Sequence, residues 1–198
     1  MRIIGGVWRR HLLPVAPVQG LRPTPDRVRE TVFNWLGQDC SGHTVLDLFA
    51  GTGALGFEAA SRGAREVVFV ESNRKVAAQL QQNQQYLAGK WPAEQGPLPV
   101  FRIDNSEALP ALQRMAKAGQ QFDLVALDPP FRSDSMKATL PALPAVLKKG
   151  GLVYAEWHED LFADQEALCR LLNQPEIEVV RHLKAGQVHA HLFALPAL

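Results

Sequence analysis

The chain has 198 residues, of which 46% are hydrophobic and 21% charged. This composition fits one globular domain that buries a full core without disulfides or structural metal. Cys40 and Cys169 lie far apart and show no His-Cys ligand spacing, so we expect no disulfide and no metal. No apolar run approaches the roughly 18 residues of a membrane span, and the N-terminus lacks a secretory signal. These features predict a cytoplasmic protein without membrane contact, and we expect a monomer.

Charge is distributed unevenly along the chain. The net charge is +1, but residues 1–37 carry six basic and two acidic side chains, a net charge of +4. All six basic residues are arginines, namely Arg2, Arg9, Arg10, Arg22, Arg27 and Arg29. Because the guanidinium fork suits phosphate oxygens, the segment is a candidate nucleic-acid arm. A solvated basic tail explains the charge equally well.

The first 23 residues contain several glycines and prolines and predict an irregular or short-stranded arm. A helix is expected to begin at Thr24, with Thr24 as its N-cap and Pro25 in the first turn. Gly37 is expected to end this helix. We therefore divide the chain into a basic arm with its helix, residues 1–37, and a main domain, residues 38–198.

From residue 44 onward, apolar runs of strand length alternate with helical patterns. Strands are expected at 44–50, 66–71, 98–104, 122–128, 151–156, 177–183 and 188–195, and helices near 54–62, 73–88, 106–118, 134–148 and 160–173. The early strands are apolar almost throughout, as in parallel sheets covered by helices on both faces. Residues 184–187 predict a turn between the last two strands. The fold class is therefore α/β, a Rossmann-like doubly wound and mostly parallel seven-stranded sheet with an antiparallel C-terminal hairpin.

Ligands of such sheets bind beyond the carboxyl ends of the strands. The first strand runs through Asp47 into the turn Gly51-Thr52-Gly53, and Glu71 ends the next strand 20 residues after Gly51. Glycines allow a ligand to approach backbone N–H groups at a helix start. A carboxylate in the position of Glu71 accepts hydrogen bonds from ribose hydroxyls. The pattern predicts a nucleoside cofactor without saying which. Glu71 can also be a solvated acid, and Asp47 can be a structural acid that holds the turn.

The third strand ends at Asp104, which Asn105 and Ser106 follow. Asp104 or Asn105 could bond an adenine amino group. Equally, these residues could cap the next helix, because Asp, Asn and Ser are all N-cap residues.

The fourth strand ends in Asp128-Pro129-Pro130-Phe131, the most specific feature of the sequence. Two prolines make a rigid loop, since each fixes its own φ and restricts the preceding residue. The Asp128 carboxylate and a proline carbonyl form an acceptor pair that matches the two hydrogens of an exocyclic amine, and Phe131 offers a stacking face for the base. Asp128 can stabilise positive charge on the nitrogen and receive its proton. The alternative is a Pro-Pro turn followed by a core phenylalanine.

Together, the turn after Asp47, the acid Glu71 and the Asp-Pro-Pro-Phe loop resemble the S-adenosylmethionine-dependent amino-methyltransferases. The N-terminal motifs narrow the resemblance to the RsmD family, bacterial enzymes that methylate the exocyclic N2 of one guanine in 16S ribosomal RNA. These motifs are Arg-Ile-Ile-Gly-Gly at residues 2–6, Leu-Arg-Pro-Thr-Pro-Asp-Arg-Val-Arg-Glu at 21–30 and Phe-Asn-Trp-Leu at 33–36. One stretch departs from the family pattern: Arg10 and His11 follow Trp8-Arg9, where the family usually has Gly followed by a basic residue.

The resemblance implies a role for each matching residue. S-adenosylmethionine would be bound by Asp47, Gly51, Thr52, Gly53, Glu71, Asp104 and Asn105, and the flipped guanine by the catalytic residues Asp128, Pro129 and Phe131. The six arginines of residues 1–37 would contact the RNA. Because the chain is small and its arm modest, we expect ribosomal proteins of a small-subunit particle to present the base.

Three other readings stay open. An NAD-dependent oxidoreductase shares the glycine turn and Glu71, but it explains neither Asp47 nor the Asp-Pro-Pro-Phe loop. A methyltransferase acting on adenine N6, cytosine N4 or a protein glutamine keeps the mechanism, although such enzymes more often have Asn at the position of Asp128. A catalytically silent RNA-binding domain is the third, and the intact acceptor pair argues against it.

Overall fold

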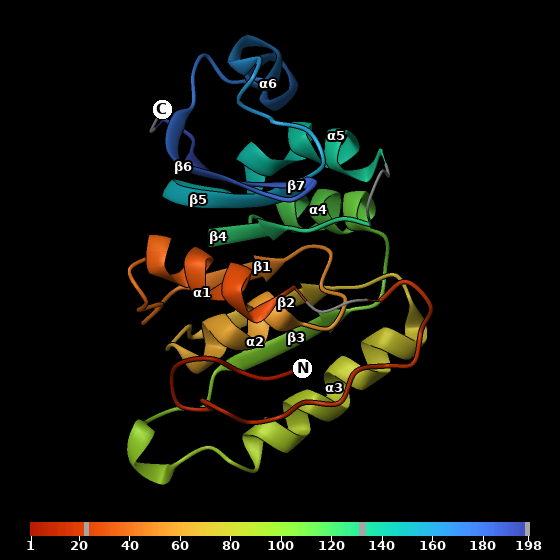
Figure 1. Ribbon diagram of the computed structural model, residues 1–198, viewed down its shortest axis with the longest axis vertical. Helices are drawn as coiled ribbons and strands as arrows, with labels where there is room; N and C mark the ends of the chain where they lie inside the picture. The colour runs from red at the N-terminus through yellow and green to blue at the C-terminus, as the bar shows by residue number, and fades with distance from the viewer. Residues whose placement is uncertain (22–23, 131–133, 197–198) are drawn as a thin grey trace. The chain divides into compact units, whose positions relative to one another are not determined.

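The computed structural model describes residues 1–21, 24–130 and 134–196 (Figure 1). Its seven strands follow the order β3-β2-β1-β4-β5-β7-β6. The chain forms two compact units, Met1–Ser106 and Glu107–Leu198. Within the described ranges, no helix is long and apolar enough to cross a membrane.

The first unit is built on three parallel strands, β1 (Thr44–Asp47), β2 (Glu66–Val70) and β3 (Val100–Asp104). Its helices are α1 (Asp26–Trp35), α2 (Ala54–Ser61) and α3 (Arg74–Ala88), with a 3-10 turn η1 (Ala93–Gln95). Phe57 of α2 packs on Phe69 of β2 with ring centroids 4.8 Å apart. Burying such rings is a main source of stability in a core of this size.

Before α1, the N-terminal segment is ordered by its own apolar residues. Ile3, Trp8 and Leu13 are buried, and an isolated antiparallel bridge joins Arg2 to Leu12. The expected N-cap at Thr24 is wrong: α1 begins at Asp26, its N-cap position is Pro25, and no side chain caps it. Gly37, with a φ of 82°, follows the end of α1 as expected.

The second unit contains β4 (Phe122–Leu127) and β5 (Leu147–Trp157) in parallel, then β7 (Val188–Ala194) and β6 (Glu178–Ala185) in antiparallel pairing. Its helical elements are α4 (Ala108–Lys117), α5 (Ser135–Thr139), the 3-10 segment η2 (Leu140–Val146) and α6 (Gln165–Leu172). Gly186, with a φ of 63°, lies in the turn between β6 and β7. The predicted hairpin is confirmed.

One predicted helix is wrong in form. Instead of one helix over 134–148, the chain has five residues of α-helix and then a 3-10 segment that contains Pro141 and Pro144. Each proline lacks an N–H donor, so a regular α-helix cannot continue through them. The fold class is otherwise as expected, an α/β chain with a mostly parallel seven-stranded sheet and an antiparallel C-terminal hairpin.

Candidate active site

The turn between β1 and α2 depends on two glycines in the left-handed region. Gly51 has a φ of 50° and Gly53 a φ of 75°. A Cβ on Gly53 would lie 2.6 Å from Leu80 Cδ2 and 2.7 Å from Phe57, so only glycine fits there. The buried Asp47 carboxylate accepts the N–H of Gly56, 3.0 Å away, and so ties the end of β1 to the first turn of α2.

Glu71 follows β2 and bonds two backbone segments. One carboxylate oxygen accepts the N–H of Gly51 at 2.9 Å, and the other accepts the N–H of Asn73 at 2.7 Å. Each oxygen has more than one acceptor position, so these bonds leave capacity for ribose hydroxyls. Glu71 therefore holds the glycine turn and is not merely a solvated acid.

Asp104 and Asn105 do not cap the next helix. The N-cap position of α4 is Glu107, which forms no side-chain cap bond. Instead, the Asn105 side-chain amide donates to the carbonyls of Glu71 and Ser72, and the Asp104 carboxylate accepts the hydroxyl of Ser106 at 2.7 Å. Asn105 thus fixes the loop that carries Glu71, and the capping alternative is wrong.

Residues of the N-terminal arm lie against the glycine turn. Pro14, Ala16 and Leu21 line a small crevice together with Gly51 and Leu80. A Cβ on Gly51 would lie 3.3 Å from Leu21 Cδ1. The arm is therefore part of the surroundings of the turn.

In the second unit, Asp128 follows β4 and is partly exposed, while Pro129 is buried. Phe131 lies outside the described residues. Because Leu127 pairs with Ala155, the next residues in register are Asp128 and Glu156 at the end of β5. Glu156 is only 9% exposed and accepts the Tyr154 hydroxyl at 2.7 Å. Two carboxyl groups and a phenol therefore gather at this end of the parallel strands.

The charge state of this group is unusual. Burial, and then the negative charge of Asp128, raise the pKa of Glu156 to about 8, against the opposing effect of the Tyr154 hydrogen bond. Burial and the two carboxylates also raise the pKa of Tyr154 well above its usual value. The two neighbouring carboxyl groups therefore oppose each other's ionisation, and Glu156 keeps its proton to a higher pH than an ordinary glutamate does.

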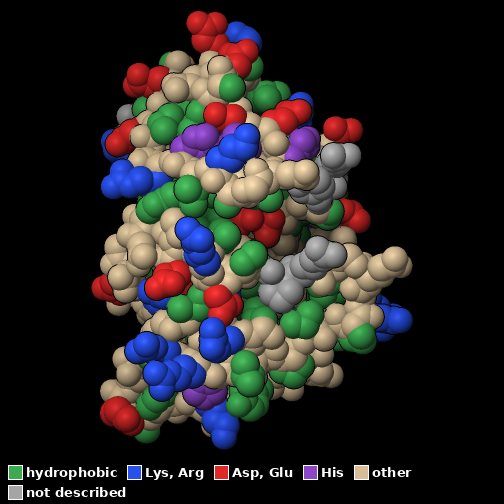
Figure 2. All heavy atoms as spheres, viewed as in Figure 1, with side chains coloured by type: hydrophobic (Ala, Val, Ile, Leu, Met, Phe, Trp, Pro, Cys, Tyr) green, Lys and Arg blue, Asp and Glu red, His purple; other side chains and the backbone are tan. Residues whose placement is uncertain are grey.

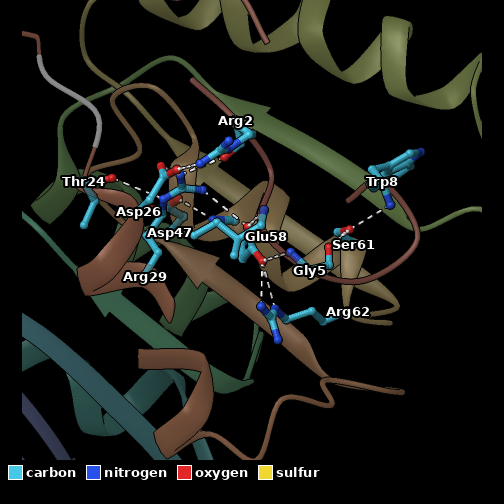
Figure 3. Close-up of polar contacts among 12 residues, drawn as sticks. Arg2, Gly5, Trp8, Thr24, Asp26, Arg29, Asp47, Glu58, Ser61 and Arg62 are labelled. Atoms are coloured by element: carbon cyan, nitrogen blue, oxygen red, sulfur yellow. Dashed lines mark hydrogen bonds and ion pairs between the residues drawn. The ribbon is translucent and has the colours of Figure 1, made fainter. Parts of the chain in front are cut away.

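Arg29 is not an RNA contact. Its side chain is 1% exposed, and its guanidinium meets the fully buried Glu58 at 3.3 Å and Asp26 at 2.6 Å (Figure 3). It also donates to the carbonyls of Arg2 and Thr24. The expectation that Arg29 binds phosphate is therefore wrong, because its guanidinium is buried and already bonds two carboxylates and two carbonyls.

The other arginines of residues 1–37 differ from Arg29. Arg9, Arg10 and Arg27 are exposed, and Arg2 is exposed while paired with Asp26 at 2.7 Å. Figure 2 shows Lys and Arg side chains gathered over the N-terminal segment. Arg22 lies outside the described residues.

Sequence reasoning missed Glu58, Tyr154 and Glu156. Glu58 is the one charged residue of helix α2, and Glu156 is an acid inside an apolar run of β5. An acid within an apolar run is expected to be buried with a partner, because burying an unpaired carboxylate is costly. This signal points to Asp47, and it points equally to both acids.

Comparisons with known proteins place the chain in a family. The family described as "Conserved hypothetical protein 95" matches residues 1–194. The protein named ribosomal RNA small subunit methyltransferase D is 42% identical in Haemophilus influenzae, over 81% of this chain and 80% of that protein. Its namesake in Escherichia coli is 42% identical over 79% of this chain and 74% of that protein.

Solved structures agree. The structure described as "Putative methyltransferase yhhF from Escherichia coli" has a TM-score of 0.79 and 36% sequence identity, and the match covers 100% of this chain and 99% of that chain. The chain therefore belongs to this family, that of the ribosomal RNA small subunit methyltransferase D proteins.

Proposed function

We propose that this chain methylates the exocyclic N2 amino group of a guanine in 16S ribosomal RNA, with S-adenosylmethionine as methyl donor. The observation that carries the proposal is the pairing of two features in a member of this family. One is a glycine turn held by the acids Asp47 and Glu71, and the other is the sequence Asp128-Pro129-Pro130-Phe131 directly after a buried strand.

The residues of the first unit fit this cofactor in their chemistry. Carboxylates are acceptors for an ammonium group and for ribose hydroxyls, and Asp47 and Glu71 supply them next to the glycine turn. We assign the methionine end to Asp47, Gly51, Thr52 and Gly53, and the ribose to Glu71. Asp104 is assigned to the adenine, while Asn105 orients the Glu71 loop. When bound, the cofactor supplies an activated methyl group.

Residues of the Asp128 loop act on the acceptor. The Asp128 carboxylate and the Pro129 carbonyl accept the two N–H groups of guanine N2, and Phe131 stacks on the base. These bonds aim the nitrogen lone pair at the methyl carbon, and most of the rate enhancement comes from this positioning. Positive charge that develops on the nitrogen is stabilised by Asp128, which then takes the proton.

The RNA is held by the exposed arginines of the arm. We assign phosphate contacts to Arg2, Arg9, Arg10, Arg22 and Arg27, five of the six expected from the sequence. Because the arm is short, ribosomal proteins in a small-subunit particle present the guanine, and the chain acts in the cytoplasm as a monomer. Equal methylation of naked and protein-bound RNA would contradict this choice of substrate.

A transfer assay with tritiated S-adenosylmethionine tests the proposal. Particles and naked 16S RNA come from bacteria without the endogenous modification, and the enzyme is wild type, Asp128→Ala or Asp134→Ala. Asp134 is exposed and forms no side-chain cap bond, so it is a matched control. We expect label with wild type and Asp134→Ala and a loss of at least about 100-fold with Asp128→Ala. Transfer that survives in Asp128→Ala would contradict the catalytic assignment.

A further inference from the structure

Three histidines and an aspartate meet at the C-terminal hairpin, in a part of the chain that the proposed reaction does not use. Asp160 follows β5, His182 is on β6, and His189 and His191 are on β7. One ligand atom from each of the four lies within 4.8 Å of every other. We propose that these four side chains bind one divalent transition-metal ion of the zinc class, as a structural site.

Strand register produces the cluster. His182 pairs directly with His191 across the antiparallel β6–β7 ladder, so both side chains stand on one face of the hairpin. His189 is two residues before His191 and shares that face, because side chains alternate along a strand. The His182 and His191 rings lie 4.9 Å apart and almost parallel. His182 is exposed and His189 is half-buried, whereas His191 is buried, so an ion would reach the cluster from the side of His182 and His189.

The spacing of the ligand atoms fits tetrahedral coordination. Bonds of about 2.0–2.1 Å set the ligand atoms of a tetrahedral zinc site roughly 3.3 Å apart. His182 Nε2 lies 3.1 Å from His189 Nδ1, His191 Nε2 lies 3.4 Å from Asp160 Oδ1, and His182 Nε2 lies 3.6 Å from the same oxygen. The other pairs of ligand atoms lie within 4.8 Å of one another. Ion binding would also turn the nearly parallel rings of His182, His189 and His191, so that one lone pair of each ring points at the ion.

The supporting contacts also resemble those of a metal site. His191 Nδ1 lies 3.2 Å from the carbonyl of Ala155, which can only accept, so Nδ1 carries the proton. Nε2 therefore presents a lone pair, which accepts the N–H of Leu161 at 3.0 Å. Metal-binding histidines usually donate their second ring N–H to a carbonyl or carboxylate in this way. Phe162 packs edge-on against His191 at 4.8 Å and shields one side.

The donor set decides the class of ion. Three imidazoles and one carboxylate suit Zn²⁺, Cu²⁺ or Ni²⁺, whereas Mg²⁺ and Ca²⁺ prefer oxygen ligands. With four protein ligands the site is closed, which is typical of a structural role. Such an ion would join the loop after β5 to both strands of the hairpin, including β6, whose residues are mostly exposed. This proposal runs against the expectation, drawn from cysteine spacing, that the chain holds no metal.

A hydrogen-bonded histidine cluster without any ion is the alternative, and Zn²⁺ titration separates the two. The chelator-treated full chain is titrated by calorimetry, as wild type, as His182→Ala/His189→Ala and as His43→Ala. His43 is exposed and lies outside the cluster, so it controls for adventitious histidine binding. The two cluster histidines are not fully buried, so their replacement should leave the fold intact, and circular dichroism checks this.

We expect one equivalent of Zn²⁺ to bind wild type and His43→Ala, and the double variant to lose at least about tenfold in affinity. Zn²⁺ should also raise the melting temperature of wild type and not that of the double variant. The amide resonance of Leu161 should shift, because binding at His191 Nε2 replaces its hydrogen bond. Equal Zn²⁺ affinity in wild type and the double variant, or no saturable binding in wild type, would overturn the proposal.

Discussion

The guanidinium of Arg29 and the carboxylate of Glu58 form an ion pair at 3.3 Å, with side chains 1% and 0% exposed. Glu58 also accepts the N–H groups of Ile4 and Gly5, each at 2.8 Å, and is paired with Arg62 (Figure 3). Since Glu58 is on α2, the helix that starts at the glycine turn, this one carboxylate anchors the N-terminal arm to the candidate cofactor site.

Replacing Glu58 by Gln should destabilise the chain strongly. The amide keeps the shape but leaves the buried Arg29 and Arg62 without the charge that compensates them, which typically costs about 3–5 kcal/mol. Denaturant unfolding measures the loss, and Glu94→Gln, at an exposed position, is the control. A loss as small as that of the control would mean that Asp26 alone compensates Arg29.

Arg10 is expected to be a strained position. Its φ of 69° lies in the left-handed region, which costs a residue with a Cβ about 1–2 kcal/mol. Arg10→Gly should therefore raise the free energy of unfolding by up to about 1 kcal/mol, once the entropic cost of glycine is subtracted. Arg9, the preceding residue, has no positive φ, so Arg9→Gly should lower the free energy of unfolding by about 0.5–1 kcal/mol. The same loss in both variants would argue against strain at Arg10.

At the glycine turn, Gly53→Ala should lower the free energy of unfolding by at least about 2 kcal/mol. The new Cβ would overlap Leu80 and Phe57, and the φ of 75° is unfavourable for alanine. Gly89→Ala is the matched control. Its Cβ would meet only carbonyl oxygens at 3.6 Å or more, and its φ is −69°, so the change should be neutral or stabilising by about 0.4–1 kcal/mol. Thermal melts of both variants test the contrast. Equal stability of the two would show that the turn tolerates a side chain.

Glu156 predicts a specific pH dependence. Its pKa is about 8 in the folded chain against 4.5 for an ordinary glutamate, so its neutral form favours the fold fully below pH 4.5 and this advantage is lost as pH rises toward 8. Glu156→Gln stays neutral, and the groups facing it, Asp128 and Tyr154, remain.

The melting temperature of Glu156→Gln relative to wild type should therefore rise from pH 5 to pH 8. For a chain of this size the rise is about 2–4 °C for each kcal/mol of unfolding free energy that wild type loses. The exposed Glu176→Gln is the control and should show a flat difference. A flat difference for Glu156→Gln would mean that Glu156 is already ionised at pH 5.

The sequence predicted the strands well where unbroken apolar runs mark them. Runs such as Val67–Val70 and Leu124–Leu127 are buried strands because apolar side chains must leave water on both faces of a parallel sheet. The helix predicted over residues 134–148 is wrong. The apolar spacing of this stretch is typical of a helix, but Pro141 and Pro144 permit only a short helix and a 3-10 segment.

Contacts between distant residues could not be predicted. Arg29 looked like part of a basic arm, and its burial depends on Glu58, 29 residues further along the chain. The histidine cluster depends on the register that pairs His182 with His191. A pattern of single residues does not contain such pairings, because register is decided by the packing of whole strands.

Mass spectrometry of nucleosides from 16S RNA tests the central claim most directly. A bacterial strain lacking the endogenous modification expresses wild type, Asp128→Ala or Asp134→Ala, and the RNA of its small subunits is digested completely. We expect wild type and Asp134→Ala to restore the N2-methylguanosine content of the RNA, and Asp128→Ala to leave it at the level of the deficient strain. Restoration of a different methylated nucleoside, or of N2-methylguanosine by Asp128→Ala, would contradict the account.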